Sequence, residues 1–316
     1  MGGVKTITIL ASTTYPIVSA YEYEFLKEEE VVRERMGRST IYLILQRPLT
    51  YFNQVRLIDG GISFNITDAK QAPLECFLPF VVNGFCNYGE DSEIELCFYK
   101  SDRDESPPFN DVGAIKVRKE NGDFVIWLSP QKFIYEVLCG NLQAEIRGDP
   151  LSFSDYRIHY IGQAFDQKVW KRLTGHEKLQ KILTLEGPMG EGPSRSPLEI
   201  SIAMLTIVGF DDNIMMGSYE SILPPFPTPI IHKLETEEEG ERFALPWVTV
   251  DSPNLTCEVE AMLVNLFKPT YNKIKFDKYP KIKRGTRAKG YTSAQLVIER
   301  LPASLRTEAH FQGPLM

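Results

Sequence analysis

The sequence predicts an α+β protein with a β-rich domain at 1–129, a smaller α/β domain at 130–280 and a basic C-terminal extension at 281–316. Three observations lead to this prediction. A chain of 316 residues, of which 43% are hydrophobic, is long and apolar enough to bury two cores. The first half carries short runs of β-branched and aromatic residues between turn clusters. The second half alternates strand and helix patterns.

The composition disfavours several classes of protein. No apolar run reaches the roughly 18 residues of a membrane-spanning helix, and the first residues lack the pattern of a secretory signal. The 5 cysteines form no C-x-x-C pair and stand beside only 4 histidines, so we expect neither a disulfide framework nor a zinc knuckle. We therefore expect a cytoplasmic protein without a membrane partner.

Seven runs in the first domain have the composition of strands. They are separated by clusters of turn-forming residues such as 87–92 and 120–123. One helix, expected at about 20–36, interrupts them and ends before Gly37. The seven expected strands are 6–10, 39–45, 61–66, 76–82, 94–99, 113–117 and 124–128.

The second domain is expected to open with two strands joined by a long loop, followed by a helix and a buried strand. A proline-rich and acidic insertion then follows at about 211–250, and its charges are typical of a solvated loop. The expected elements are strands at 133–138 and 158–162, a helix from about 167 to 183, and a strand at 198–208.

A helix expected at 253–267 places a carboxylate on an apolar face. Glu260 stands three, four and seven residues before Leu263, Val264 and Phe267, so all four share one side of the helix. A buried carboxylate is normally paired, hydrogen-bonded or bound to a metal. Two interpretations remain open: an ion pair with a nearby lysine or arginine, and a ligand of Mg²⁺ at a cleft.

Basic residues are concentrated near the end of the chain. Nine lysines and arginines lie between Lys268 and Lys289 against one acid, Asp277, in a protein of net charge −7. Such a strip predicts a polyanionic partner, although a solvated surface segment has the same composition. The candidate nucleic-acid contacts are Lys171, Lys273, Lys275, Lys281, Lys283, Arg284 and Arg287.

Two side chains of the helix that follows residue 162 are expected on one face. Arg172 and His176 stand four residues apart. A guanidinium group suits phosphate because its planar fork donates two hydrogen bonds and stays charged. Alone, the pair is equally typical of a solvated helix face.

Two triplets resemble the strand motifs of the GIY-YIG nuclease family. Phe133-Ile134-Tyr135 resembles the first motif, with Phe133 in place of its glycine. Tyr160-Ile161-Gly162 is similar to the second motif without a change. The resemblance covers roughly residues 131–275.

The later motifs occur in the order of the same family. Arg172 is similar to the family's helix arginine, and His176 to the histidine one turn later in its restriction-endonuclease-like members. Glu260-Ala261-x-Leu263 resembles the glutamate helix. Pro269-Thr270-Tyr271-Asn272 resembles the closing segment, whose asparagine completes the site.

The resemblance implies a short central antiparallel sheet flanked by helices, and a metal-dependent endonuclease that acts on double-stranded DNA. Glu260 would hold one Mg²⁺ or Mn²⁺, and Arg172 would stabilise the charge of the transition state. One of the two tyrosines, Tyr135 by resemblance, would act as base, and Asn272 would fix the geometry through its amide. The implied catalytic residues are Tyr135, Tyr160, Arg172, His176, Glu260 and Asn272.

The alternatives come from different functional classes. The first is an endonuclease in a restriction or anti-phage context, whose β-rich domain recognises a target or a partner. The second is an inactive nucleic-acid-binding or protein-interaction module on a decayed fold, which the missing first glycine favours. An RNA-cleaving toxin is a third. Cutting both strands with one site per chain usually needs two copies, which favours a homodimer, although the sequence shows no interface signature.

Overall fold

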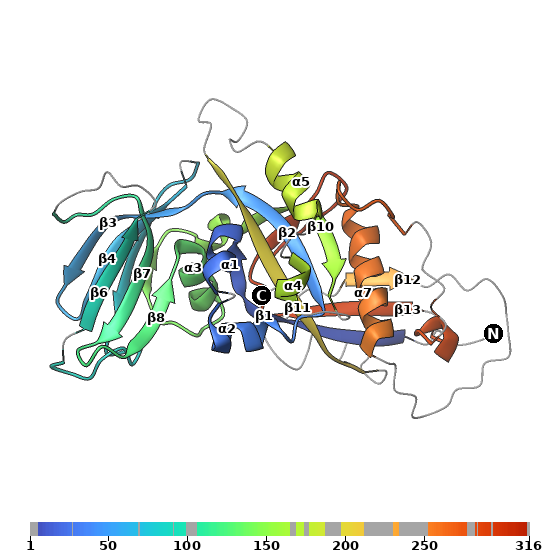
Figure 1. The fold of residues 1–316 in the computed structure, drawn as a ribbon, viewed down its shortest axis with the longest axis horizontal. Helices are drawn as coiled ribbons and strands as arrows, with labels where there is room; N and C mark the ends of the chain where they lie inside the picture. The colour runs from blue at the N-terminus through green and yellow to red at the C-terminus, as the bar shows by residue number, and fades with distance from the viewer. Residues whose placement is uncertain are drawn as a thin grey trace.

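The chain forms two β-sheets with helices packed on and between them (Figure 1). It is a mixed α/β structure rich in strands, as the sequence predicts. The computed structural model describes residues 6–26, 28–68, 70–90, 92–98, 106–164, 169–173, 177–186, 197–211, 230–233, 252–276, 282, 284–291 and 293–314.

The larger sheet, called sheet A here, has eight strands in the order β12-β13-β1-β11-β2-β10-β14-β15. It is mixed, because β1 runs parallel to β13 and β10 runs parallel to β14, whereas β2 is antiparallel to both of its neighbours. Its strands are β1 (Thr6–Ser19), β2 (Ile41–Pro48), β10 (Asp155–Gln163), β11 (Leu198–Asp211), β12 (Ile230–Lys233), β13 (Ser293–Glu299), β14 (Ser304–Arg306) and β15 (Phe311–Gln312).

The second sheet, sheet B, has seven strands: β6-β7-β3-β4-β5-β9 in order, with β8 paired to β7. All its pairs are antiparallel. Residues Ile62, Phe64 and Ile66 alternate along one strand and bury one face, as an antiparallel sheet covered on one side requires. The strands are β3 (Tyr51–Ile58), β4 (Gly61–Thr67), β5 (Leu74–Pro79), β6 (Ser92–Phe98), β7 (Val112–Lys119), β8 (Phe124–Leu128) and β9 (Glu145–Arg147).

Helices cover both faces of sheet A. The longest, α7, packs its apolar residues with one face, and the other four α-helices near this sheet contribute to the core on the opposite face. Helix α3 packs into the core of sheet B instead. The helices are α1 (Ala20–Leu26), α2 (Glu30–Met36), α3 (Pro130–Leu138), α4 (Val169–Leu173), α5 (Glu177–Leu185) and α7 (Ser252–Phe267), with 3-10 turns η1 (Pro150–Phe153) and η2 (Arg287–Lys289).

Sheet B is built from a segment inserted into sheet A. The chain leaves sheet A at the end of β2, forms all the strands of sheet B, and returns as β10, which pairs with β2. Strands from both halves of the sequence therefore share sheet A, and the boundary expected between residues 129 and 130 does not coincide with the division between the sheets.

The strand expected at 133–138 is wrong, because this segment lies in helix α3. Ser129 caps the helix by accepting a hydrogen bond from the Lys132 N–H, and Pro130 is the first helical residue. Phe133 and Ile134 are fully buried, and Val137 follows one turn later on the same side. A short apolar run of this kind fits a buried strand and a buried helix equally well.

Other expectations are confirmed or extended. The helix expected at 20–36 is present as two short helices, α1 and α2, and the helix expected at 253–267 is α7. Strands β13, β14 and β15 lie in the expected C-terminal extension but belong to sheet A. Most of the expected insertion at 211–250 lies outside the described residues. In the described part of the chain, no helix combines the length and apolar character needed to cross a bilayer.

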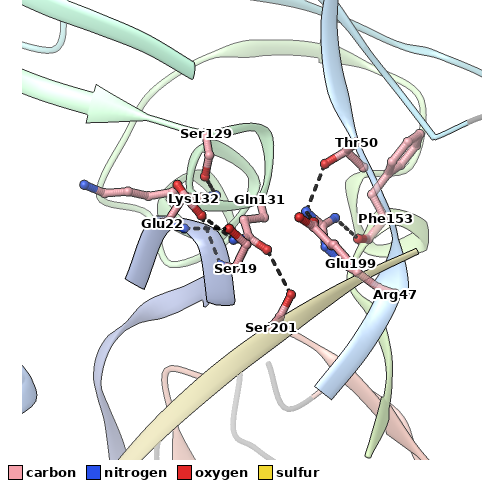
Figure 2. Close-up of polar contacts among 10 residues, drawn as sticks. All are labelled: Ser19, Glu22, Arg47, Thr50, Ser129, Gln131, Lys132, Phe153, Glu199 and Ser201. Carbon is pink, nitrogen blue, oxygen red and sulfur yellow. Dashed lines mark hydrogen bonds and ion pairs between the residues drawn. The ribbon is translucent and has the colours of Figure 1, made fainter. Parts of the chain in front are cut away.

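A buried polar network joins helix α3 to sheet A (Figure 2). The Glu22 carboxylate accepts hydrogen bonds from the Ser19 N–H at 3.1 Å and from Gln131 Nε2 at 2.6 Å. The Ser201 hydroxyl in turn donates to Gln131 Oε1 at 3.4 Å. Because α3 belongs to the core of sheet B, this network fixes the two sheets against each other.

A second contact at the same junction is a buried ion pair (Figure 2). Arg47 Nη2 lies 2.8 Å from Glu199 Oε1 and donates to Thr50 Oγ1 at 2.9 Å. Arg47 Nη1 donates to the carbonyl of Phe153 at 3.2 Å. Burial raises the pKa of Glu199 to about 7, although the neighbouring Arg47 guanidinium acts in the opposite direction.

Candidate functional site

Two tyrosines meet on neighbouring strands of sheet A. Tyr42 on β2 and Tyr160 on β10 have ring centroids 6.1 Å apart, tilted by 41°. The antiparallel register places Gly162 opposite Tyr42 and Tyr160 opposite Ile44. Tyr42 is fully buried and Tyr160 is half-buried, on the face that α1, α2, α4 and α5 cover.

Gly162 allows the two tyrosines to come together. A Cβ atom at this position would lie 2.6 Å from the Tyr42 hydroxyl oxygen and 2.7 Å from a ring carbon of Tyr160. Both distances are shorter than real carbon atoms tolerate, so either ring would have to move. The glycine of the Tyr160–Gly162 motif is therefore required by packing.

Asn272 holds the middle of the same triplet. Its Oδ1 accepts a hydrogen bond from the Ile161 N–H at 2.9 Å, and its Nδ2 donates to the Ile161 carbonyl at 2.8 Å. Strand β14 pairs with β10 only as far as Arg157, so this part of the edge has no strand partner in the described chain. The Asn272 amide thus takes the place of a neighbouring strand and fixes the edge at Ile161.

Glu260 lies on α7, which packs against β10. Leu263, Val264 and Phe267 of its predicted stripe are fully buried, and Glu260 itself is half-buried. Three residues earlier, Cys257 Sγ donates to Gln163 Oε1 at the end of β10, at 3.4 Å. Glu260 is on the same side of the helix as Cys257, toward the edge of β10.

The neighbouring carboxylate, Glu258, attaches the basic segment to α7. Its Oε1 lies within hydrogen-bond distance of the Thr286 N–H, at 2.6 Å. A Cβ atom at Gly285 would collide with the same oxygen, so only glycine allows this close approach. Arg284 is exposed and Arg287 is half-buried beside this contact. Two of the predicted nucleic-acid contacts are thus fixed to the helix that carries Glu260.

The other predicted nucleic-acid contacts lie on several segments of the chain. Lys171 on α4 and Lys273 after α7 are exposed. Lys275 donates to the carbonyl of Pro269, and burial lowers the pKa of its ammonium group. Lys281 and Lys283 lie outside the described residues.

Two predicted catalytic residues have no described side chain. Arg172 lies on α4, whose backbone is described at this position, nine residues after Gln163, the last residue of β10. His176 lies outside the described residues. Their positions relative to the tyrosines stay predictions.

Tyr135 lies in another part of the molecule. Its hydroxyl is 2.5 Å from Thr13 Oγ1 and donates to the carbonyl of Arg300 at 2.7 Å. Burial raises its pKa well above the ordinary value.

The strand order and register of sheet A give the approximate distance between Tyr135, which contacts β1, and Tyr160 on β10. Thr13 on β1 pairs with Leu205, Leu205 pairs with Ile41, and Ile41 pairs with Gln163 on β10. Three strand spacings separate β1 from β10, or roughly 14 Å. The structure therefore brings Asn272 and α7, which carries Glu260, to β10. Tyr160 points to the face of sheet A opposite the one that α7 covers, and Tyr135 lies in another part of the molecule.

Sequence reasoning missed Tyr42. Its signal was the triplet Thr40-Ile41-Tyr42 at the start of an expected strand, which resembles a strand motif ending in tyrosine as closely as residues 133–135 do. What the sequence does not reveal is that β2 is the antiparallel neighbour of β10.

Comparisons with protein-family models, with curated proteins and with solved structures found no match. Function is therefore inferred from the geometry of β2, β10 and the segments around them.

The carboxylates in the described part of the chain allow only a simple metal site. No group of three or more His, Cys, Asp or Glu side chains there is placed to hold a metal ion. Mg²⁺ is often held by one or two carboxylates with waters and substrate phosphate completing the shell. The single half-buried carboxylate of Glu260 fits that arrangement and does not fit a structural zinc site.

Proposed function

We propose that the protein is a metal-dependent endonuclease that hydrolyses phosphodiester bonds in double-stranded DNA. The observation that carries this proposal is the pair of tyrosines, Tyr42 and Tyr160, on adjacent antiparallel strands. Both rings pack against Gly162. The Asn272 amide, which fixes the backbone at Ile161 between Tyr160 and Gly162, supports it.

The proposal changes one assignment made from the sequence. Tyr42 takes the place expected of Tyr135 as the partner of Tyr160, because it is the tyrosine that meets Tyr160. Tyr160 is half-buried and accessible to water, so it is the better candidate for orienting or deprotonating the nucleophile. A tyrosine with an ordinary pKa near 10 needs a cation close by for this task.

The remaining residues supply charge and position. Arg172 lies on α4, which follows β10 and Tyr160 in the sequence. It is proposed to stabilise charge on the phosphate oxygens in the transition state. Glu260 is proposed as the protein ligand of one Mg²⁺ or Mn²⁺, which when bound would polarise the phosphate and stabilise the leaving oxygen. Asn272 holds the backbone between Tyr160 and Gly162 in place.

The basic residues after α7 are proposed to bind the DNA backbone. Arg284 and Arg287 are anchored to α7 through Thr286 and Glu258, so their charge lies at a fixed position relative to Glu260. A homodimer, which would place two sites on the two strands, and a restriction or anti-phage context belong to the same proposal.

The complete burial of Tyr42 favours a second candidate function. A tyrosine without exposed surface has no direct access to a water nucleophile, and its ring also packs as a core residue. The alternative is a non-cleaving nucleic-acid-binding or protein-interaction module that keeps the same fold.

The two functions are separated by a cleavage assay. Purified protein is incubated with supercoiled plasmid and with single-stranded RNA, in Mg²⁺, in Mn²⁺ and in EDTA, alongside Glu260→Gln. Glu34→Gln, an exposed carboxylate on α2, is the control. Metal-dependent cutting of plasmid that is lost only in Glu260→Gln supports the endonuclease. Binding without cutting in all conditions overturns it in favour of the module.

A further inference from the structure

Strand β10 changes the face to which its side chains point between Ile158 and Tyr160. Tyr156 and Ile158 pack in the core beneath α7, as alternate residues of a strand should. Tyr160 is two residues further on, yet it packs in the core on the opposite face, beside Tyr42. A regular strand would have placed Tyr160 under α7.

A β-bulge at His159 causes this change. Ile158 pairs with Leu45 and Tyr160 with the next residue, Ile44, so His159 is an extra residue without a partner position on β2. One extra residue shifts the alternation by one and moves every following side chain to the other face. The bulge therefore decides whether Tyr160 meets Tyr42.

The His159 side chain is held from two sides. It is 1% exposed, its Nε2 is 3.1 Å from Gln46 Oε1 on β2, and its Nδ1 is 3.5 Å from Glu186 Oε1 just after α5. The Tyr271 hydroxyl donates to the same Glu186 oxygen at 2.7 Å.

The backbone of the bulge is held as well. The Tyr271 N–H donates to the His159 carbonyl at 3.1 Å, next to the contact between Asn272 and Ile161. The bulge is thus fixed by three elements that are distant in sequence: β2, the end of α5 and the segment after α7.

We propose that His159, clamped by Glu186 and Tyr271, is the positioning residue that turns Tyr160 toward Tyr42. The inference depends on the proposed function in one respect, namely that Tyr160 acts in catalysis. His159 touches no reacting atom in this account, and it acts through the direction of the tyrosine that follows it.

The charges around His159 favour a neutral ring. Burial lowers its pKa, Arg157 on the same strand acts in the same direction, and the Glu186 carboxylate opposes them. A neutral ring donates one hydrogen bond, and the ring nitrogens face two acceptors, Gln46 Oε1 and the Glu186 carboxylate.

The direct test follows the Tyr160 ring without any assay of activity. Fluorotyrosine is incorporated at position 160 of the full chain, and its ¹⁹F resonance is compared in His159→Ala, His159→Gln, Glu186→Gln and Tyr271→Phe. Tyr156→Phe, which removes a hydroxyl from the same strand on the other face, is the control.

We expect the resonance to move and broaden in His159→Ala, Glu186→Gln and Tyr271→Phe, to be largely restored in His159→Gln, and to stay unchanged in Tyr156→Phe. A Tyr160 resonance unchanged in all three network variants overturns the inference. If His159→Ala does not fold, the spectra of Glu186→Gln and Tyr271→Phe decide whether the inference holds. Each of these substitutions nearly keeps the size of the side chain.

Cleavage kinetics provide a second test of the inference. A tyrosine misplaced by about 1 Å should cost on the order of 10- to 100-fold in kcat with KM unchanged. His159→Gln should recover most of that loss. A rise in KM at constant kcat in these variants would contradict a positioning role. Failure of the unmodified protein to cut any substrate would remove the proposed nuclease while leaving the ¹⁹F result to decide on the bulge.

Discussion

Sheet A and sheet B bury their strands in different ways. In sheet A, strand β2 is buried along nearly its whole length, because helices cover both faces. In sheet B, strand β6 alternates half-buried with exposed residues, as expected of an antiparallel sheet with one face in water. Around β10 in sheet A, the polar side chains of His159 and Asn272 are buried away from water.

Burial of polar groups in sheet A demands partners, and those partners define the candidate site. The Asn272 side chain makes two hydrogen bonds to the backbone of Ile161, and the His159 side chain contacts Gln46 and Glu186. Around sheet B many of the described polar contacts involve exposed side chains, such as those of Asn87 with Glu90 and of Gln54 with Asn110. We therefore expect variants in sheet B to change stability, and variants around β10 to change activity.

The largest expected effect on stability is in sheet B. Phe133→Ala removes a fully buried ring that packs edge-on against Phe64, with centroids 5.0 Å apart, and should cost about 3–5 kcal/mol of unfolding free energy. Urea unfolding measures the loss. Cleavage per folded molecule should stay unchanged at a temperature where the variant remains folded. A fall in specific activity would contradict the assignment of stability to sheet B and of activity to the region around β10.

The next effect is on activity in sheet A. Arg172→Ala should lower the cleavage rate on the order of 10²-fold or more, because charge on the phosphate oxygens loses its stabilising partner. Its control is Lys116→Ala on β7, which pairs with Glu95 at 3.1 Å and should change the rate less than twofold. Equal effects of the two substitutions would contradict the assignment of α4 to the site.

A smaller effect on stability sharpens the role of the edge of β10. Asn272→Ala leaves the N–H and carbonyl of Ile161 without their side-chain partner, and should cost about 2 kcal/mol. Hydrogen exchange at the Ile161 amide should accelerate in the variant. Unchanged protection of this amide would show that the edge is held by other contacts.

A pH-dependent effect concerns the junction between the sheets. Burial raises the pKa of Glu199 from its ordinary 4.5 to about 7, so the folded state holds this proton more tightly than the unfolded chain does. The stability from this group is fully present below pH about 4.5 and is lost as pH rises through about 7. Thermal unfolding between pH 5 and 8 should show the decline, and Glu199→Gln should flatten it. A decline that persists in the variant would assign it to another group.

Local patterns account for what could be predicted. The alternation of Ile62, Phe64 and Ile66 predicts a half-buried strand, and the spacing of Leu263 and Phe267 predicts the face of α7 on which Glu260 lies. These features depend on neighbours within one or two turns of the chain.

Non-local pairing accounts for most of what was missed. Tyr42 and Tyr160 meet across a hairpin interrupted by the whole of sheet B, and no local pattern records that pairing. The bulge at His159 is also invisible in the sequence, because it depends on partners from β2, α5 and the segment after α7. Strand β13 was missed because the basic residues before it dominated the interpretation.

We propose that the site is built on the β2–β10 pair and not on helix α3. Comparing the plasmid cleavage rates of Tyr42→Phe and Tyr135→Phe, each of which removes one hydroxyl, distinguishes the two positions. We expect Tyr42→Phe to lose at least tenfold in rate with DNA binding retained, and Tyr135→Phe to keep its rate while losing about 1 kcal/mol of stability. A nuclease that tolerates Tyr42→Phe but is inactivated by Tyr135→Phe would rule out a site on the β2–β10 pair.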